Sequence, residues 1–382
     1  MKIDPYKHKE RFFKWKKKVK KSIPDVSKND SDLIKKYIFD MEKGINISSL
    51  SKKGSRSYIR LNTIKDKIIF LSKKFKELYD LNNLIDVTED QLHEFFTNMR
   101  KGIVKRKDGK RYQTTSDFVK DFKAFWHWYI KIQKKEGNIV EDITSDLDSS
   151  REKSLWVYLT EEQVRKICNK AKYEYKVLIM FLFDSGIRAP TELMNIKISD
   201  LFNDFTELNI RDEISKTFGR RIKLMFCSDL LKEYVKDKKL GKEDFLFKIS
   251  PPVVNKYLQR LSKKIFGNKE SEAGEKYSRI TMYDFRHCSA CYWLPRYKSE
   301  SALKYRFGWK SSRFIHYYTE LLGMKDTISE EDLLIDITKT DIEKRLIRTE
   351  QENDLLNEKM IVMEKQMQDI QELTNNLYMK IK

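Results

Sequence analysis

Residues 281–287 read Thr-Met-Tyr-Asp-Phe-Arg-His, and residues 307–318 read Phe-Gly-Trp-Lys-Ser-Ser-Arg-Phe-Ile-His-Tyr-Tyr. Each stretch places cations among aromatic side chains, and Gly308 is of a type that commonly ends a helix. A guanidinium binds oxyanions through paired hydrogen bonds. Arg286 and Tyr318 are therefore the first candidates for a functional site, in a part of the chain expected to be mostly helical.

A second candidate stretch reads Asp-Ser-Gly-Ile-Arg-Ala-Pro-Thr-Glu-Leu at residues 184–193. An apolar helix is expected to end at Gly186, and Pro190 fits the first turn of a following helix. Arg188 is then expected near a helix N-terminus, which favours anion binding, with Glu192 placed to orient it. A purely structural ion pair between Arg188 and Glu192 is the alternative.

A third candidate is the sequence Ser-Lys-Thr at residues 215–217. Strand-like runs at Glu207–Ile214 and Arg220–Phe226 flank residues 217–219, which predicts a β-hairpin with a three-residue loop. Lys216 lies at the mouth of this hairpin, where its flexible ammonium group is able to reach into a cleft. An ordinary turn lysine is the alternative.

The N-terminal half has a helical pattern. Between Asp30 and Glu136 the apolar residues recur at spacings of three and four, which predicts four or five helices with one buried stripe each. The stripes are Ile34, Tyr37, Ile38 and Met41; Ile64, Ile68, Leu71, Phe75 and Leu78; Leu92, Phe95, Phe96 and Met99; and Phe118, Phe122, Phe125, Trp126 and Tyr129.

Before and after these helices the composition changes. The first 22 residues hold ten Lys or Arg against two acids, which predicts a basic arm that is either simply solvated or binds nucleic acid. Residues from Glu136 to Lys153 are polar and acid-rich and read as a linker, after which Thr160 is expected to cap a new helix. The predicted segments are an arm at 1–29, a helical domain at 30–136, a linker at 137–154, a second domain at 155–325 and an extension at 326–382.

The extension has the pattern of a coiled coil at about residues 341–382. Steps of four and three from Ile342 reach twelve positions, of which nine are apolar, and Asn353 occupies one of the others. Such spacing predicts a coiled-coil helix in which a buried amide fixes the register. The alternative is a long amphipathic helix packed on its own chain. This segment carries seven Lys or Arg and nine Asp or Glu, a net charge of −2.

The composition points to a polyanionic partner. The 382 residues include 78 Lys or Arg and 58 Asp or Glu, a net charge of +20, so the rest of the chain carries +22. The longest apolar run, Val177–Phe183, is too short to span a membrane, and the N-terminus has no secretory pattern. The four cysteines predict a reducing compartment. Beside His287, Cys288 and Cys291 lack the further ligands of a zinc site, so packing in the core is the preferred reading and no metal or other cofactor is expected.

In this order and at these separations, the candidate stretches resemble the tyrosine recombinase, or phage integrase, family. Gly186-Ile187-Arg188 resembles the first catalytic arginine motif, Ser215-Lys216-Thr217 the hairpin lysine, Asp284-Phe285-Arg286-His287 the second arginine motif, and Gly308-Trp309 with Tyr318 the nucleophile motif. The resemblance covers nearly all of residues 30–322. It implies a mainly α fold with a small β-hairpin or sheet, in which a SAM-like helical core-binding domain precedes the catalytic domain.

The resemblance also implies roles for these residues. Arg188 and Arg286 would bind the non-bridging phosphate oxygens, Tyr318 would attack the phosphorus, and Lys216 would protonate the leaving oxygen. Tyr317 is a competitor for the nucleophile. The remaining site residues would support the phosphate or position their neighbours; they are Tyr283, Trp309, Glu192 and His287.

Three positions differ from the usual family pattern. Tyr283 stands where the family has histidine, Trp309 stands where most members have histidine, and Glu192 follows Arg188 by four residues instead of three. The Tyr283 difference resembles archaeal branches of the family, which vary at this position.

The function implied is site-specific recombination of double-stranded DNA through a 3′-phosphotyrosyl intermediate, without metal or ATP. The protein would be a prokaryotic, cytoplasmic, DNA-associated integrase of a mobile element, or a chromosome-dimer resolvase, assembling as a tetramer on paired sites with further self-association through the tail. No membrane partner is expected. The alternatives are a non-cutting architectural DNA-binding protein with the same fold, and a type IB topoisomerase-like enzyme.

Overall fold

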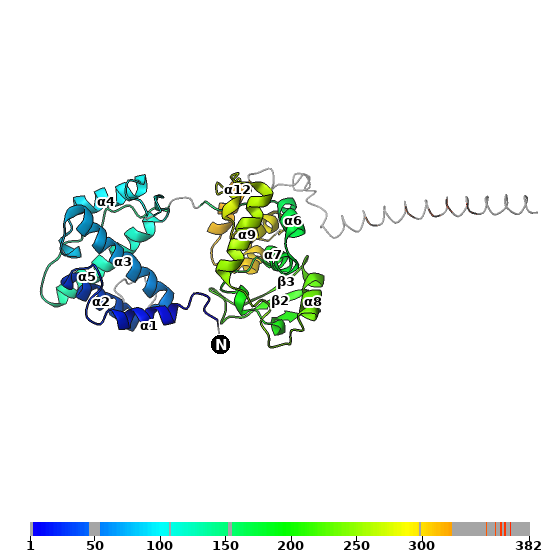
Figure 1. Cartoon of the computed structure of the whole chain (residues 1–382), viewed down its shortest axis with the longest axis horizontal. Helices are drawn as coiled ribbons and strands as arrows, with labels where there is room; N and C mark the ends of the chain where they lie inside the picture. The colour runs from blue at the N-terminus through cyan, green and yellow to red at the C-terminus, as the bar shows by residue number, and fades with distance from the viewer. Residues whose placement is uncertain are drawn as a thin grey trace, which may run out of the picture. The chain divides into compact units, whose positions relative to one another are not determined.

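The computed structural model describes residues 3–45, 54–106, 108–151, 155–297 and 299–322, together with five single residues of the C-terminal extension. Most of the predicted coiled coil at 341–382 therefore lies outside the described residues. Contacts divide the chain into a unit at residues 1–321 and a second unit at 322–382. The first unit contains two groups of helices, which are described separately (Figure 1).

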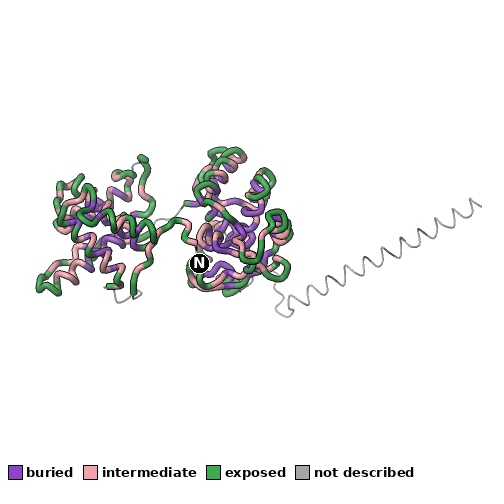
Figure 2. Tube along the Cα trace, turned by 60° about the horizontal axis from the view of Figure 1, so that its bottom comes forward, coloured by how far each residue is buried: buried purple, intermediate pink, exposed green. Residues whose placement is uncertain are grey.

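The first group has five α-helices among its described residues. Its core is aromatic: Phe75 contacts Phe95 edge-on with ring centroids 5.0 Å apart, and contacts Phe122 at 6.0 Å. Fifteen of the eighteen residues of the predicted stripes are buried and lie on α-helices, which confirms the helical prediction. Figure 2 shows the buried parts of the chain in purple. The helices are α1 His8–Lys18, α2 Lys28–Lys43, α3 Tyr58–Tyr79, α4 Glu89–Lys101 and α5 Thr115–Lys135.

The basic N-terminal segment is a packed helix where a separate arm was expected. Phe12 of α1 is completely buried, and Val19 and Ile23 just after the helix are also buried in the same core. The apolar residues interleaved with the cations therefore anchor this segment to the helical group, since burying each one stabilises the packed form by about 1.5–3 kcal/mol. Most of the cations of α1 remain exposed.

The expected linker is also packed for most of its length. Leu147 is buried in the core of the first group, and Val140 and Ile143 pack against it. Polar contacts reinforce this packing: the Trp126 indole donates to the Glu141 carbonyl at 3.0 Å. Residues 137–151 thus form a strap on the helical group, because their few apolar side chains find a place in its core.

The second group is built around α7, Tyr173–Ser185, which is apolar and buried along most of its length. A helix that is apolar on all sides belongs in the centre of a domain, and α10 packs along it. The start of α6 is as predicted: Thr160 is the N-cap, and Gln163 completes a capping box. The surrounding helices are α6 Glu161–Lys170, α8 Ser228–Asp237, α9 Pro251–Phe266, α10 Asp284–Trp293, α11 Glu300–Phe307 and α12 Arg313–Leu322.

A small antiparallel sheet completes this group. It has the order β1-β2-β3, with β1 at Leu201–Phe202, β2 at Glu207–Ile210 and β3 at Arg220–Lys223. The predicted hairpin is present, but its loop runs over residues 211–219 instead of three residues, because Ile210 already pairs with Arg220. No helix in the described part of the chain is long and apolar enough to cross a membrane.

Candidate active site

Arg188 lies just beyond the C-terminus of α7. Gly186 caps that helix with φ +59°, and a Cβ at this position would collide with the ring of Phe307. The expected α-helix after Pro190 is absent: the chain makes a turn and then the short 3₁₀ helix Leu193–Asn195. The prediction that Arg188 sits at a helix N-terminus is therefore wrong. Its guanidinium is held by side-chain and main-chain acceptors instead.

Glu192 is the carboxylate shared by two arginines. Its Oε1 accepts from Nη1 of Arg188 at 2.7 Å, and its Oε2 accepts from Nη2 of Arg220 at 2.9 Å. Glu192 and Arg220 are both almost completely buried. Burial by itself would raise the pKa of Glu192, but Arg220 and then Arg188 outweigh it and lower the pKa to about 2. The carboxylate is therefore ionised at any physiological pH.

Arg286 is the second buried guanidinium expected from the sequence. Its Nη1 donates to the Gly186 carbonyl at 2.5 Å and its Nη2 to the Phe307 carbonyl at 2.6 Å. Burial, with a further contribution from the charge of Arg188, lowers the pKa of Arg286 to about 10. The guanidinium remains charged at neutral pH, and among the described residues it donates hydrogen bonds to these two main-chain carbonyls.

Three consecutive carbonyls at the end of α11 accept hydrogen bonds from three different arginines. The carbonyl of Arg306 accepts from Nε of Arg220 at 2.8 Å, that of Phe307 accepts from Arg286 as described, and that of Gly308 accepts from Nη2 of Arg188 at 2.9 Å. The last carbonyls of a helix lack intrahelical partners and carry its partial negative charge. We call residues 306–308 the carbonyl turn. It gathers the guanidinium groups at one place.

Tyr318 lies on α12 and is only 3% exposed. Its hydroxyl is 2.7 Å from Nδ1 of His287, and its ring stacks on Trp309 with centroids 5.5 Å apart. Trp156 covers both Tyr318 and His287, at centroid distances of 6.1 and 4.7 Å. Burial raises the pKa of the Tyr318 phenol far above its usual value, although Arg286 acts in the opposite direction. The phenol is therefore held protonated in the free protein.

Lys216 lies exposed on the loop between β2 and β3. Its two neighbours are fixed: Ser215 Oγ is 3.4 Å from Oε1 of Glu192, and Thr217 Oγ1 donates to the Gly308 carbonyl at 2.9 Å. Within the described part of the chain, the Lys216 ammonium group makes no hydrogen bond or ion pair. The loop is thus anchored on both sides of a lysine whose side chain is free to reach a substrate.

Tyr283 and Trp309 differ in their exposure. Tyr283, which immediately precedes α10, is 43% exposed and meets the His287 ring edge-on at 5.1 Å. Trp309 is 6% exposed and lies between the rings of Phe307 and Tyr318. The structure therefore brings these two predicted residues to the same site as Tyr318, one at its rim and one inside it.

The comparison with protein families identifies this part of the chain. The model described as the phage integrase family matches residues 157–323. Residues 157–323 are a phage integrase family domain. No curated protein sequence matches the chain.

Solved structures of tyrosine recombinases share the fold of the integrase domain and its neighbouring helices. One is the XerH site-specific recombinase bound to palindromic difH substrate in a post-cleavage complex, with 17% identity, coverage of 69% of this chain and 77% of that one, and a TM-score of 0.53. Another is a lambda integrase dimer bound to a COC′ core site, with 16% identity, coverage of 77% of each chain and a TM-score of 0.55. A third is the Tn1549 transposon integrase in complex with circular intermediate DNA, with 15% identity, coverage of 81% and 98%, and a TM-score of 0.53.

Several residues of the integrase site were not assigned from the sequence. Arg220 was expected only as the first residue of a strand, and Arg306, Asp184 and Trp156 had no expected role. Their importance comes from burial and from partners far away in the chain, which local patterns do not reveal. The sequence offers one signal for these residues: several further arginines stand close to the family-like motifs.

The paired cysteines of α10 lie in the core of the integrase domain. Cys288 and Cys291 are buried, and burial raises the pKa of both thiols. The Leu159 amide donates to the Cys288 sulfur at 3.3 Å. Among the described residues no group of three or more His, Cys, Asp or Glu side chains is arranged to hold a metal ion.

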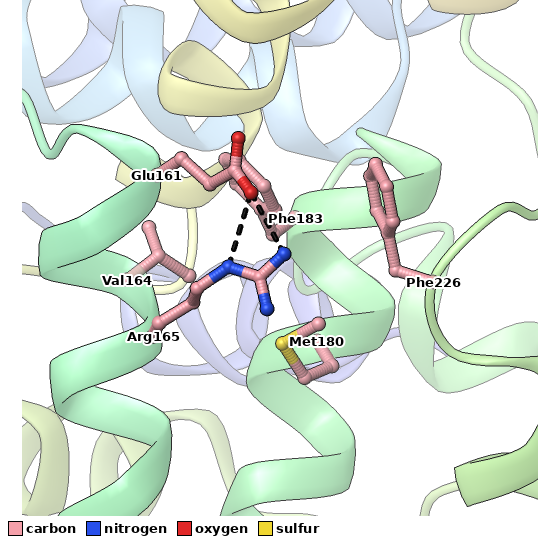
Figure 3. Close-up of a pocket in the computed structure, with 6 residues that line it drawn as sticks. All are labelled: Glu161, Val164, Arg165, Met180, Phe183 and Phe226. Carbon is pink, nitrogen blue, oxygen red and sulfur yellow. Dashed lines mark hydrogen bonds and ion pairs between the residues drawn. The ribbon is translucent and has the colours of Figure 1, made fainter.

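Two cavities of the integrase domain lie apart from this site. The smaller, of about 10 Å³, lies between α6 and α7, where the guanidinium of Arg165 meets the carboxylate of Glu161 at 2.8 Å (Figure 3). The larger, of about 190 Å³, is lined by residues of α7, α8 and α9 and by the chain leading to α9. None of the candidate catalytic residues lines either cavity.

Proposed function

We propose that this protein is a site-specific DNA recombinase that cleaves DNA with Tyr318 and rejoins it through a 3′-phosphotyrosyl intermediate. The observation that carries the proposal is the group of buried guanidiniums beside Tyr318. Arg188 and Arg220 share the carboxylate of Glu192, whereas Arg286 binds main-chain carbonyls, so three guanidiniums and one carboxylate leave a net charge of +2. Burying unbalanced charge is costly, so such a cluster favours an anionic substrate such as a phosphodiester.

Each group has a defined part in the proposed reaction. Arg188 and Arg286 stabilise the negative charge that develops on the non-bridging oxygens. The phenol of Tyr318 gives its proton to Nδ1 of His287, 2.7 Å away, as its oxygen forms a bond to phosphorus and the bond from phosphorus to the 5′-oxygen breaks. Lys216 supplies the proton that the 5′-oxygen takes up. Rejoining reverses these steps. It needs no ATP, because the phosphotyrosyl bond retains the energy of the broken linkage.

The remaining predicted residues support these four. Glu192 fixes Arg188, and Trp309 and His287 hold the ring and the hydroxyl of Tyr318. Tyr283 is exposed at the rim, where its phenol is available to donate to a phosphoryl oxygen in place of the family histidine. Since Tyr318 is buried and protonated in the free protein, DNA binding must uncover the phenol before attack.

The basic surface binds the phosphate backbone of DNA in this proposal. Outside the tail the chain carries +22, and the packed α1 presents Lys9, Arg11, Lys14, Lys17 and Lys18 on its exposed side. Affinity for duplex DNA should therefore fall steeply with salt, since each phosphate contact releases counterions. The structural neighbours described as bound to DNA, among them a lambda integrase tetramer on a Holliday junction, support both DNA binding and assembly into tetramers.

We also propose that the tail makes contacts between protomers. Leu356, Met360, Met363 and Met367 occupy predicted seam positions, are helical, and are 59%, 55%, 60% and 69% exposed. Apolar side chains repeated along one helix face in this way favour a second helix as the partner. Deleting residues 341–382 should lower the number of protomers per assembly, obtained from the mass measured by light scattering, and an unchanged number would refute the proposal.

The cleavage proposal is tested with a pool of nicked duplexes of random sequence. Cleavage near a nick releases a short fragment that carries the 5′-hydroxyl, and the covalent adduct is trapped because this fragment diffuses away before rejoining. Wild type should give a denaturation-resistant protein–DNA adduct, and sequencing the trapped strands reports the target site. The Tyr318→Phe variant should give none, while Tyr317→Phe should still form the adduct. An adduct that survives Tyr318→Phe contradicts the nucleophile assignment.

The same assays separate the two alternative functions. Binding of DNA without any adduct on the selected site would favour an architectural protein. Relaxation of supercoils without recombinant products would favour a topoisomerase.

A further inference from the structure

We propose that Arg306 is a positioning residue of this site: its side chain holds the carbonyl turn in place and thereby sets the positions of Arg188, Arg220 and Arg286 together. The inference rests on the proposed recombinase function for its catalytic consequence. Arg306 itself is 2% exposed, so its side chain acts through the turn and not on the DNA.

The guanidinium of Arg306 joins three parts of the chain. Its Nη2 donates to the Asp184 carbonyl at 2.5 Å and lies 3.3 Å from Oδ1 of the same residue. Its Nη1 donates to the Lys223 carbonyl at 3.0 Å and to the Tyr297 hydroxyl at 3.2 Å. The end of α7, the end of β3 and the segment before α11 therefore converge on this one side chain.

An aromatic ring fixes the plane of this guanidinium. The Cζ atom of Arg306 lies 4.1 Å from the centroid of Trp293, whose indole donates to the Asp184 carbonyl at 3.1 Å. A planar group with several fixed donors suits this arrangement, whereas a lysine ammonium is a single point charge that cannot span Asp184 and Lys223 in the same way. Position 306 therefore requires arginine, because lysine cannot make the same set of contacts.

Asp184 also binds the segment that follows β3. Its Oδ2 accepts from the backbone amides of Met225, Phe226 and Cys227 at 2.8, 2.6 and 3.2 Å. The Asp184 carboxylate is completely buried. Asp184 and Arg306 together therefore fix α7, β3 and α11 against one another, directly behind the three arginines.

The consequence concerns the carbonyl turn. Its three carbonyls are the acceptors of Arg220, Arg286 and Arg188, so a shift of the turn moves all three guanidiniums at once. A displacement of about 1 Å in a catalytic group can slow a reaction about 100-fold. Loss of the Arg306 anchor should therefore slow cleavage while the DNA-contacting surface stays intact.

The test compares Arg306→Lys with Arg165→Lys, a matched variant of the exposed arginine in Figure 3. The first readout is the position of the arginine side-chain NMR signals of Arg188, Arg220 and Arg286 in the DNA-free protein. We expect these signals to shift in Arg306→Lys and to stay in place in Arg165→Lys. Unshifted signals in a folded Arg306→Lys would overturn the proposal, whether or not the protein cleaves DNA.

The second readout is single-turnover adduct formation at saturating DNA. Arg306→Lys should be slower than wild type by about 100-fold, with a Kd for DNA within about twofold of wild type, and Arg165→Lys should be unchanged. On a substrate with a neutral methylphosphonate at the scissile position the deficit should shrink, because the arginines then have no charge to neutralise. An equal deficit on both substrates, or a wild-type rate, contradicts positioning of the arginines.

If Arg306→Lys does not fold, Asp184→Asn replaces it, because the amide keeps the shape of the side chain and one acceptor oxygen while weakening the pairing. The same shifts and the same substrate dependence are expected, and their absence overturns the proposal. If wild type forms no adduct, the recombinase function fails, and the NMR readout still decides whether Arg306 positions the arginines.

Discussion

The Nδ1 atom of His287 lies 2.7 Å from the hydroxyl oxygen of Tyr318. Burial, with a smaller contribution from the charge of Arg286, lowers the pKa of His287 to about 3. The imidazole is therefore neutral at physiological pH and can accept a hydrogen bond from the phenol. This contact fixes the hydroxyl of the candidate nucleophile without adding a positive charge next to the arginines.

The lowered pKa of His287 makes stability depend on pH. The unfolded chain binds a proton near pH 6.5 and the folded chain only near pH 3, so the free energy of unfolding should fall as pH drops from about 6.5 towards 3. The His287 contribution is at most about 1.4 kcal/mol per pH unit. Urea unfolding at pH 7, 6 and 5 should show a smaller loss for His287→Gln than for wild type, and parallel curves would contradict this. Glu192 does not interfere between pH 5 and pH 7, because its pKa is near 4.5 in the unfolded chain and about 2 in the folded chain.

Replacing Glu192 by glutamine should strongly destabilise the protein. The change leaves Arg220, which is buried and held by Glu192 at 2.9 Å, without its charged partner, and breaking such a buried pair costs about 3–5 kcal/mol. The measurement is the free energy of unfolding in urea. Glu161→Gln, which removes the partner of exposed Arg165 (Figure 3), is the control and should cost less than about 1 kcal/mol. Similar losses in both variants would show that the buried network contributes no special stability.

Substituting Gly308 by alanine should impair both stability and cleavage. Gly308 has φ +59°, and a Cβ there would lie 3.0 Å from both Nη1 of Arg220 and Oγ1 of Thr217. We expect a loss of about 1–3 kcal/mol from the strained backbone and an additional displacement of the arginines that slows adduct formation. Gly137→Ala is the control, because Gly137 has φ +84° with nothing within 4 Å of the added Cβ. It should lose stability only, and a normal cleavage rate in Gly308→Ala would contradict the expected displacement.

Lys216→Ala should affect chemistry without affecting folding. The side chain is exposed, so we expect a stability change within about 0.5 kcal/mol and a cleavage rate lower by about 100-fold or more. A substrate with sulfur as the 5′-leaving atom should restore the rate, because a thiolate leaves without being protonated. Failure of this substrate to rescue the variant would argue against Lys216 as the general acid.

Much of the fold was predictable because helical periodicity reports burial directly. The stripes of α2 to α5 and the Thr160 cap of α6 are local patterns, and both match the structure. The wrong predictions lie where tertiary contacts determine the local backbone structure. The chain after Arg188 turns to bring Glu192 back onto the Arg188 amide at 2.9 Å, so the proline did not start a helix there. The nine-residue β2–β3 loop is similarly set by its contacts with Glu192 and Gly308.

The candidate site was predictable at the level of motifs and less so at the level of partners. Arg188, Arg286 and Tyr318 stand in recognisable sequences, and the structure places them near one another. The pairing of Arg220 with Glu192, and of Arg306 with Asp184, was not predictable, because most arginines in a basic protein are exposed. Only the folded chain distinguishes an arginine that is buried among carbonyls from one that faces solvent.

The packed strap at residues 137–151 determines where the helical domain can be cut. A fragment that stops at Glu136 would uncover the apolar surface on which Val140, Ile143 and Leu147 lie, and would also remove the carbonyl that receives the Trp126 indole. Such a fragment should aggregate or unfold readily, since a small domain tolerates little loss of core. The shortest self-contained N-terminal piece therefore ends near Arg151, sixteen residues beyond the end of α5.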